Sequence, residues 1–208
     1  MAFTFFFRDL QVLESAVSAL IPVIAGRSRV RIWDAGCAYG PEPFSLAIVL
    51  AERLNKFAFR NIHITASDID NEDDFQATIA KAEYSADGVS RLPKEILKKY
   101  FEPMGLGSSY RVLPLITERI NFVRHDLLNL KPIGEGYSMI ICKNVLLHFS
   151  YEQRVKVISM FKDALAENGI LAFEQTQEMP KELNEFFEKA SGDSQVFKKK
   201  ACEPALKI

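Results

Sequence analysis

The sequence predicts an α/β fold in which helices cover a doubly wound, mostly parallel sheet. Short runs rich in β-branched residues alternate with longer stretches of helical periodicity from residue 30 onward, which is the pattern of successive βα units. The chain has 208 residues, 48% of them hydrophobic, which suits one large domain with a substantial core. A turn with two glycines joins the first predicted strand to a helix, as in folds that bind a ligand at the carboxyl ends of parallel strands.

The first two units are the clearest. Residues 30–33 read as a strand, residues 34–40 as the glycine turn and residues 43–54 as a helix with one apolar face. A second strand is expected over 62–67, followed by an acidic loop over 68–74 and a short helix over 75–82. Residues 1–29 precede these units, and we expect them to form an N-terminal segment and helix that closes the ligand site.

Glycines and prolines interrupt the alternation between residues 84 and 119. Only residues 96–101 look helical there, and residues 110–112 look strand-like. We therefore predict a small inserted subdomain over 84–119 within a domain that spans 30–208.

The alternation resumes after this insertion. Strands are expected over 120–123 and 138–142, and a helix over 153–165 that Asn168 and Gly169 cap. The remaining elements are a parallel strand over 170–173, a charged surface helix over 180–190 and one or two closing strands over 195–208.

Composition excludes several classes of function. Lys and Arg total 26 and Asp and Glu total 27, so charge gives no reason to expect a nucleic acid or an anionic membrane as partner. The three cysteines Cys37, Cys142 and Cys202 form no CxxC pair, which suits a reducing compartment and supports no metal site. The longest apolar stretch, residues 16–24, is too short to span a bilayer. We therefore expect a cytoplasmic protein without a metal.

The turn Asp34-Ala35-Gly36-Cys37-Ala38-Tyr39-Gly40 is the first candidate for ligand contact. Its small residues let a ligand approach the backbone where a strand passes into a helix. No Gly-Lys-Ser/Thr follows and the GxGxxG spacing is absent, which disfavours a P-loop protein or a nicotinamide-dependent enzyme. An ordinary glycine turn explains this loop equally well.

Acidic residues follow the next two strands. Asp68 ends the second strand, where a carboxylate can accept hydrogen bonds from ribose hydroxyls; Asp70 competes for that role, and either residue could instead cap a helix. Asp126 follows the third strand of the predicted sheet, within His125-Asp126-Leu127. It could meet an adenine amino group or simply cap a turn.

Polar residues also end the apolar strand over 138–142. Lys143 and Asn144 are expected to emerge at the same sheet edge as the other loops. His148 follows shortly after and could orient a substrate carboxylate, although a lone histidine is more often structural.

Several of these segments together resemble the chemotaxis-receptor (CheR-type) methyltransferases, which esterify glutamate side chains on bacterial chemoreceptors. The segments that resemble the family's motifs are Thr4-Phe5-Phe6-Phe7-Arg8-Asp9, Trp33 to Ser45 with Pro41-Glu42-Pro43-Phe44-Ser45, Ser67-Asp68-Ile69-Asp70, Asp126-Leu127-Leu128, and Cys142-Lys143-Asn144-Val145 through Phe149. Tyr100-Phe101 and Tyr110-Arg111-Val112 resemble the family's small β-subdomain. The family carries a helical domain ahead of the first of these segments, and this chain begins at that segment.

The resemblance implies a Rossmann-like domain that binds S-adenosylmethionine (SAM) and releases S-adenosylhomocysteine. It implies that Thr4, Arg8, Glu42, Asp68, Asp126, Leu127 and Asn144 contact or surround SAM, and the strand-end loops add Asp34, Gly36 and Lys143 to the predicted cofactor site. Arg8 and His148 are the expected catalytic residues. The chain departs from the family motifs at Pro41 (Glu in the family), Asp126 (Asn), Lys143 (Arg) and His148 (Tyr).

The expected acceptor is a glutamate carboxylate on a protein such as the cytoplasmic part of a chemoreceptor. The alternatives are a related methyltransferase that acts on another protein or on a small acid, and a SAM-binding regulatory module without catalysis.

Overall fold

The computed structural model describes residues 4–70 and 74–201. Its centre is a seven-stranded sheet with the strand order β6-β2-β1-β7-β8-β10-β9. The first five of these strands are parallel and the last two are antiparallel additions, so the predicted mostly parallel α/β fold is confirmed. The strands are β1 (Val30–Ala35), β2 (Ile62–Asp68), β6 (Ile120–Arg124), β7 (Tyr137–Cys142), β8 (Leu165–Phe173), β9 (Phe187–Lys189) and β10 (Val196–Lys199).

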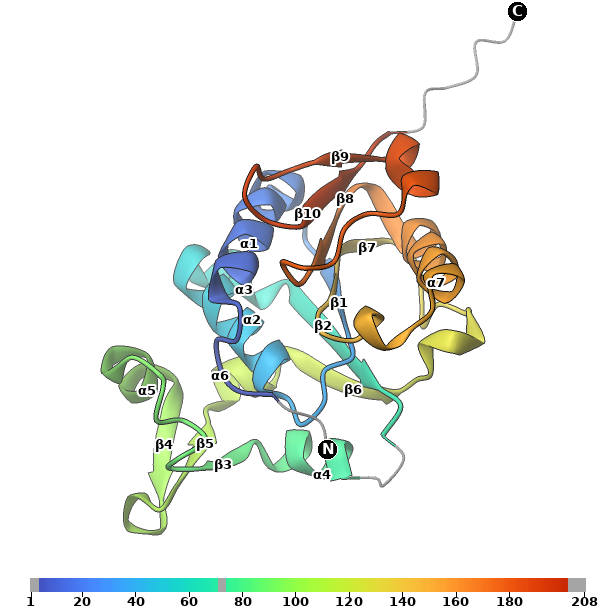
Figure 1. Ribbon diagram of the computed structural model, residues 1–208. Helices are drawn as coiled ribbons and strands as arrows, with labels where there is room; N and C mark the ends of the chain where they lie inside the picture. Colours follow the sequence, from blue (N-terminus) through green and yellow to red (C-terminus); the bar gives the residue numbers. More distant parts are fainter. Residues whose placement is uncertain (1–3, 71–73, 202–208) are drawn as a thin grey trace, which may run out of the picture.

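Helices cover both faces of this sheet (Figure 1). The helices α1 (Leu10–Ile24) and α2 (Pro41–Arg53) pack on one face, against side chains such as Ile32 and Met139. The helix α7 (Tyr151–Ala164) packs on the other face, against the alternate side chains of the same strands, such as Trp33. Period-two alternation along buried strands thus divides the core into two layers.

The ends of the helices follow local sequence rules. Pro41 occupies the first turn of α2, where its missing N–H leaves no hydrogen bond unmade. At α7, the Ser150 side chain accepts a hydrogen bond from the Gln153 backbone while the Gln153 side chain accepts one from the Ser150 backbone. This capping box satisfies two backbone donors at the helix start.

A second, three-stranded antiparallel sheet has the order β3-β5-β4 and lies to one side of the main sheet (Figure 1). Its strands are β3 (Glu83–Ser85), β4 (Phe101–Met104) and β5 (Ser109–Val112), with the helix α5 (Lys94–Tyr100) beside β4. The short helices are α3 (Lys56–Arg60), α4 (Asp74–Lys81) and α6 (Pro114–Thr117), together with the 3₁₀ turns η1 (Gly105–Gly107), η2 (Leu127–Asn129), η3 (Leu146–His148) and η4 (Lys181–Phe186).

Two predicted features were wrong. Asn168 and Gly169 do not cap α7, which ends at Ala164, because Leu165 already pairs with Tyr137 in the sheet. Asn168, with φ 61°, instead lies where the pairing register of β8 shifts.

The expected surface helix over 180–190 is also absent. Only the 3₁₀ turn η4 forms there, and the chain then pairs as β9 with the free edge of β10. Pairing that edge and burying Phe187 outweigh the helical propensity of the charged residues. Of the expected closing strands over 195–208, β10 is present and residues 202–208 lie outside the described part.

Candidate functional site

A cavity of about 560 Å³ lies beyond the carboxyl ends of β1, β2, β6 and β7. The strand order reverses at the β1–β7 boundary, and this is where open α/β sheets bind ligands. Every predicted cofactor-site or catalytic residue except Asp34 lines the cavity. Its lining comprises Thr4, Arg8, Gly36, Ala38, Glu42, Ser67, Asp68, Ile69, His125, Asp126, Leu127, Leu128, Lys143, Asn144, Val145, Leu147, His148 and Phe149.

The glycine loop between β1 and α2 forms one wall. The backbone N–H groups of Gly36 and Cys37 both donate to the Ser67 carbonyl, at 2.7 and 3.1 Å. Gly36 has φ 98°, and a Cβ at this position would lie 2.1 Å from Val145 Cγ2. A glycine is therefore required both by the backbone conformation and by the close approach of Val145.

Asp68 and Asp70 have different roles, although both follow β2. The Asp68 carboxylate faces the cavity and accepts hydrogen bonds from the backbone N–H of Ala38 at 2.9 Å and of Ile69 at 2.8 Å. Asp70 is buried and accepts from the backbone N–H of Phe75 and Gln76, at the start of α4. Asp70 therefore caps a helix, and Asp68 is the carboxylate available to a ligand.

The segment after β6 forms the opposite wall. Asp126 Oδ1 accepts a hydrogen bond from the Leu128 N–H at 2.8 Å, so this exposed residue caps the turn η2 while it also lines the cavity. The His125 ring packs edge-on against Trp33, and its Nε2 lies 2.8 Å from the Lys131 carbonyl oxygen. Apolar side chains of Leu127 and Leu128 complete this wall. Such a surface suits a flat heteroaromatic ring.

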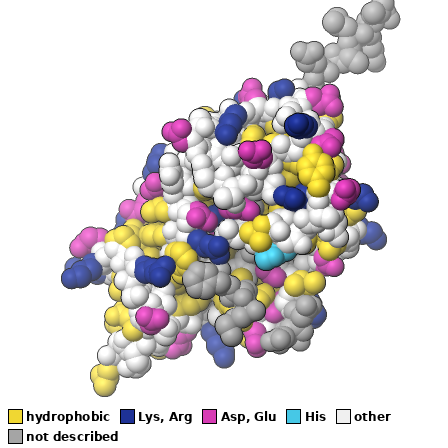
Figure 2. Space-filling model, viewed as in Figure 1, with side chains coloured by type: hydrophobic (Ala, Val, Ile, Leu, Met, Phe, Trp, Pro, Cys, Tyr) yellow, Lys and Arg dark blue, Asp and Glu magenta, His cyan; other side chains and the backbone are white. Residues whose placement is uncertain are grey.

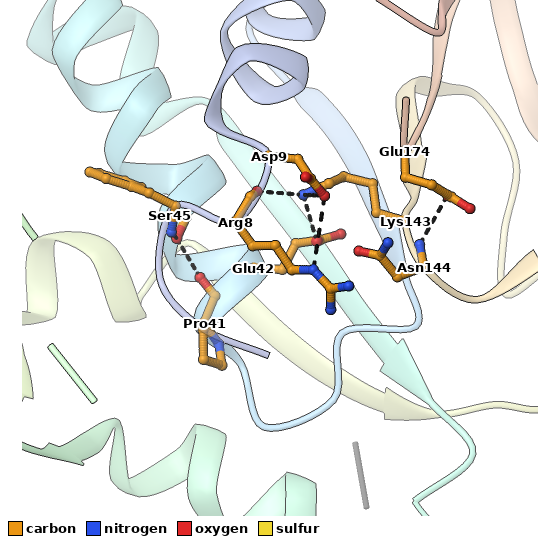
Figure 3. A network of polar contacts seen from close by, with 9 residues as sticks. Arg8, Asp9, Pro41, Glu42, Ser45, Lys143, Asn144 and Glu174 are labelled. Atoms are coloured by element: carbon orange, nitrogen blue, oxygen red, sulfur yellow. Dashed lines mark hydrogen bonds and ion pairs between the residues drawn. The ribbon is translucent and has the colours of Figure 1, made fainter. Parts of the chain in front are cut away.

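Lys143 occupies the floor of the site (Figure 3). Its side chain is fully buried, and its Nζ donates to the Glu42 carboxylate at 3.0 Å and to the Arg8 carbonyl oxygen at 2.8 Å. The Asp9 carboxylate lies 3.8 Å from the same ammonium. One buried cation thus joins β7, α2 and the segment that precedes α1.

That N-terminal segment holds Arg8 at the cavity. Phe6 is buried against the rings of Tyr84 and Phe101, and the Phe7 N–H donates to Ser45 Oγ at 2.9 Å. Phe7 and Asp9 both have left-handed backbone conformations, with φ 60° and 52°. Each such non-glycine residue costs about 1–2 kcal/mol, which the anchoring contacts on both sides of Arg8 offset.

Two buried carboxylates near Lys143 have oxygen atoms that the described part of the chain leaves unsatisfied. Both oxygens of Asp34 and Oε1 of Glu42 are buried without a hydrogen-bond partner among the described residues. Burial raises the pKa of Asp34 well above its ordinary value of 3.8, an effect that the nearby Glu42 increases and Lys143 opposes. Burial also raises the pKa of Glu42, against the lowering effect of Lys143. Asp34 does not line the cavity, which differs from its predicted place in the cofactor site.

His148 and Thr4 lie at the margin. His148 is an exposed residue at the end of the turn η3, beside the 52% exposed Leu147, and both line the cavity. Thr4 is the first described residue and lines the cavity from the N-terminal side. Arg8 and His148 therefore reach one cavity from segments that are far apart in the sequence.

Other reactive groups offer no competing chemistry. Burial raises the pKa of the Cys37 and Cys142 thiols well above 9.0, so both stay protonated and unreactive near neutral pH. Within residues 4–70 and 74–201, no cluster of three or more His, Cys, Asp or Glu side chains is arranged to hold a metal ion. In the same ranges no helix combines the length and apolarity that crossing a membrane requires.

Apart from Leu127, sequence reasoning missed the apolar part of the lining. Ile69 and Val145 follow directly on predicted polar residues and Leu147 directly precedes His148, and this adjacency was the available signal. Glu174, just after β8, was also missed: it is 3% exposed and accepts a hydrogen bond from the Asn144 N–H at 2.9 Å. Nothing in its local sequence distinguishes it from a surface glutamate.

The residues present fit SAM. The cavity has the size of a cofactor site, and the approach of Val145 to Gly36 shows that the glycine loop admits no added side chain. Carboxylates and an apolar wall suit a cationic nucleoside, because the Asp68 oxygens can accept from ribose hydroxyls and unpaired buried acceptors attract an ammonium or a sulfonium.

Comparison with known proteins agrees with this geometry. The family described as "CheR methyltransferase, SAM binding domain" matches residues 2–196. The chain is 30% identical to "Chemotaxis protein methyltransferase 2" of Vibrio cholerae, over 96% of this chain and 72% of that protein. It is also 30% identical to the "Chemotaxis protein methyltransferase" of Listeria innocua, over 80% of this chain and 61% of that protein.

A solved structure supports the fold. The magnesium protoporphyrin IX methyltransferase of Synechocystis, crystallised with bound SAM, aligns with a TM-score of 0.52 at 20% identity, covering 93% of this chain and 80% of that chain. This likeness concerns the arrangement of helices and strands.

Proposed function

The chain belongs to the CheR methyltransferase SAM-binding domain family, and from that premise we propose that it transfers a methyl group from SAM to a glutamate side-chain carboxylate of a chemoreceptor-like protein in the cytoplasm. The observation that carries this proposal is the convergence of Arg8, Glu42, Asp68 and Asn144 on one cavity at the strand-order reversal. These residues come from four separate elements, so packing of a single helix or strand does not explain their meeting.

Each residue receives a role from its surroundings. Asp68 has one backbone N–H on each carboxylate oxygen, which leaves lone pairs for the two ribose hydroxyls. Asp126 and the leucines after it would accept the adenine ring. Glu42 and Asn144 lie nearer Arg8 and would surround the methionyl end of SAM.

Methyl transfer to a carboxylate requires of the protein mainly that it position the two reactants. When bound, SAM supplies an electrophilic methyl group on a sulfonium, and a carboxylate acceptor is already ionised near neutral pH. Neither a metal nor a general base is required. The chain's task is to hold the acceptor oxygen in line and to exclude water, and such positioning contributes several kcal/mol to catalysis.

Arg8 is the group proposed to orient the acceptor. Its guanidinium presents paired N–H donors that match a carboxylate. The contacts of Phe7 and of the Arg8 carbonyl oxygen fix the backbone on both sides of this side chain. His148 at the margin would assist by contacting the acceptor.

The first test is calorimetric titration of the purified chain with SAM and with S-adenosylhomocysteine. Both should bind saturably, and Asp68→Ala should lose both. Asp163→Ala, an exposed carboxylate on α7, is the matched control and should bind as the wild type does. If neither compound binds the wild type, the proposal fails.

The acceptor requires a second assay. Labelled SAM incubated with a chemoreceptor cytoplasmic fragment should yield label that mild base releases as methanol, as an ester demands. Base-stable label would exclude a carboxylate acceptor. SAM binding with no transfer to the fragment or to other candidate proteins and acids would favour a regulatory module.

A further inference from the structure

Glu174 is a buried carboxylate that does not line the cavity. It follows the last residue of β8 and is 3% exposed, a degree of burial that is rare for a glutamate. Burying a carboxylate carries a large desolvation cost unless hydrogen bonds compensate it. In the described part of the chain, Oε1 of Glu174 has no partner and Oε2 has one.

That one partner is the backbone of Asn144. The Asn144 N–H donates to Glu174 Oε2 at 2.9 Å, and Asn144 has a left-handed conformation with φ 58°. Figure 3 shows the backbone nitrogen of Asn144 turned toward Glu174 and its side-chain amide directed the other way, toward Arg8 and Glu42. The hydrogen bond thus accompanies the backbone conformation that turns the amide into the site.

Val145, which follows Asn144, connects the same turn to the glycine loop. Val145 occupies the space that a side chain at Gly36 would need, 2.1 Å from an added Cβ. The turn at 144–145 therefore contributes the Asn144 amide and also packs directly on the glycine loop between β1 and α2. A shift of this turn would move both surfaces.

We infer that Glu174 is a positioning residue for the cofactor: it holds Asn144 in the left-handed conformation that presents its side-chain amide to SAM. This inference rests on the proposed function. It assigns Glu174 the role of a hydrogen-bond acceptor for a backbone N–H, and it assigns no role to its charge.

Three substitutions separate these two roles. Glu174→Gln keeps an acceptor oxygen at the same reach and removes the charge, and its SAM Kd should stay within about threefold of wild type. Glu174→Asp keeps the charge and shortens the side chain by one methylene, which withdraws the oxygen from Asn144. Glu174→Asp and Glu174→Ala should both weaken SAM binding by about tenfold, the usual effect of losing one hydrogen bond. A role for the charge predicts the opposite order, with Asp better than Gln.

A double-mutant cycle tests whether the effect passes through Asn144. Glu174→Ala should weaken binding about tenfold in the wild-type background and by less than about twofold in the Asn144→Ala background. The exposed Glu178, four residues further along the same segment, provides the control Glu178→Ala, which should bind SAM normally.

The outcomes distinguish this inference from the proposed function. If the wild type binds no SAM, the proposed function fails. If the wild type binds SAM and Glu174→Asp or Glu174→Ala binds equally well, the inference alone fails. An equal loss in both backgrounds of the cycle, or better binding by Asp than by Gln, would also overturn it. If the Ala variant does not fold, the Asp and Gln comparison still decides.

Discussion

Replacing Gly36 with alanine should damage the site more than the size of a methyl group suggests. Gly36 has φ 98°, beyond the left-handed region that L-residues tolerate best. The added Cβ would also lie 2.1 Å from Val145 Cγ2 and 3.3 Å from Val145 Cβ. Relief of that contact requires movement of the glycine loop or of the turn that carries Asn144, and both line the cavity.

The expected loss has two parts. The backbone conformation costs an alanine about 1–2 kcal/mol, and overpacking of a tight contact costs about 1–3 kcal/mol. Gly36→Ala should therefore lower the free energy of unfolding by about 2–5 kcal/mol and weaken SAM binding at least tenfold. Val145→Ala removes the Cγ2 methyl that makes the closest contact. The double variant should therefore recover the stability that the steric contact costs, while the cost of the backbone conformation at position 36 remains.

The backbone and steric contributions can be measured by urea unfolding and by calorimetric SAM titration. Both methods are applied to the two single variants and to the double variant. Non-additivity of about 1–3 kcal/mol in favour of the double variant is expected. A free energy of unfolding of Gly36→Ala within about 0.5 kcal/mol of the wild-type value, or the lack of any rescue by Val145→Ala, would refute this expectation. In either case the close approach of Val145 would not be what requires a glycine at position 36.

Other predictions follow from the buried charges. Because burial raises the pKa of Asp34 above 3.8, the folded state binds its proton more tightly than the unfolded state, and stability falls as pH rises from about 4 to the raised pKa. Asp34→Asn should thus be more stable than wild type at pH 7 by about 1–2 kcal/mol, no more stable at pH 3, and weaker in SAM binding; equal melting at pH 7 would contradict this. Lys143→Met leaves Glu42 without its cation and should lower the free energy of unfolding by about 3–5 kcal/mol, measured by urea unfolding. Arg8→Ala should reduce methyl transfer at least tenfold while SAM affinity changes less than threefold; unchanged turnover would remove Arg8 from the mechanism.

The parallel sheet could be predicted because each strand carries its own signal. Residues 138–142 are apolar throughout, and their expected strand differs from β7 by one residue at its start. Short elements with few core residues carry weaker signals: β3 and β4 have no predicted counterpart, and β9 lies within the stretch predicted to be helical. These strands form through pairing with distant partners, which local periodicity does not contain.

The candidate site also combines features that local sequence predicts with features that depend on tertiary packing. The residues that meet at the cavity could be expected from strand ends, since parallel strands present their carboxyl ends together. The hydrogen-bond partners of those residues could not be expected from the sequence. No local pattern shows that Lys143 binds Glu42 and the Arg8 carbonyl oxygen, or that Glu174 binds the Asn144 backbone. Such contacts depend on side-chain positions that only tertiary packing fixes.

On the face drawn in Figure 2, acidic and basic side chains are interspersed, in keeping with the nearly balanced charge of the chain. Among the residues that the structure describes, this face therefore carries no extended patch of one charge that could steer an acceptor toward the protein from a distance. Recognition would depend on contacts at close range.

The hydrogen bond from Lys143 to the Arg8 carbonyl oxygen joins residues 135 positions apart. On a ribosome that adds about 5–20 residues per second, the N-terminal segment waits roughly 7–27 s for Lys143 to be made. Throughout that interval β8 and β10, against which α1 packs, are also missing, so only part of the apolar side of α1 can be covered, by elements such as α2. This N-terminal segment therefore reaches its place only after most of the domain has been synthesised, and until then the face of α1 that later packs on β8 and β10 is open to aggregation.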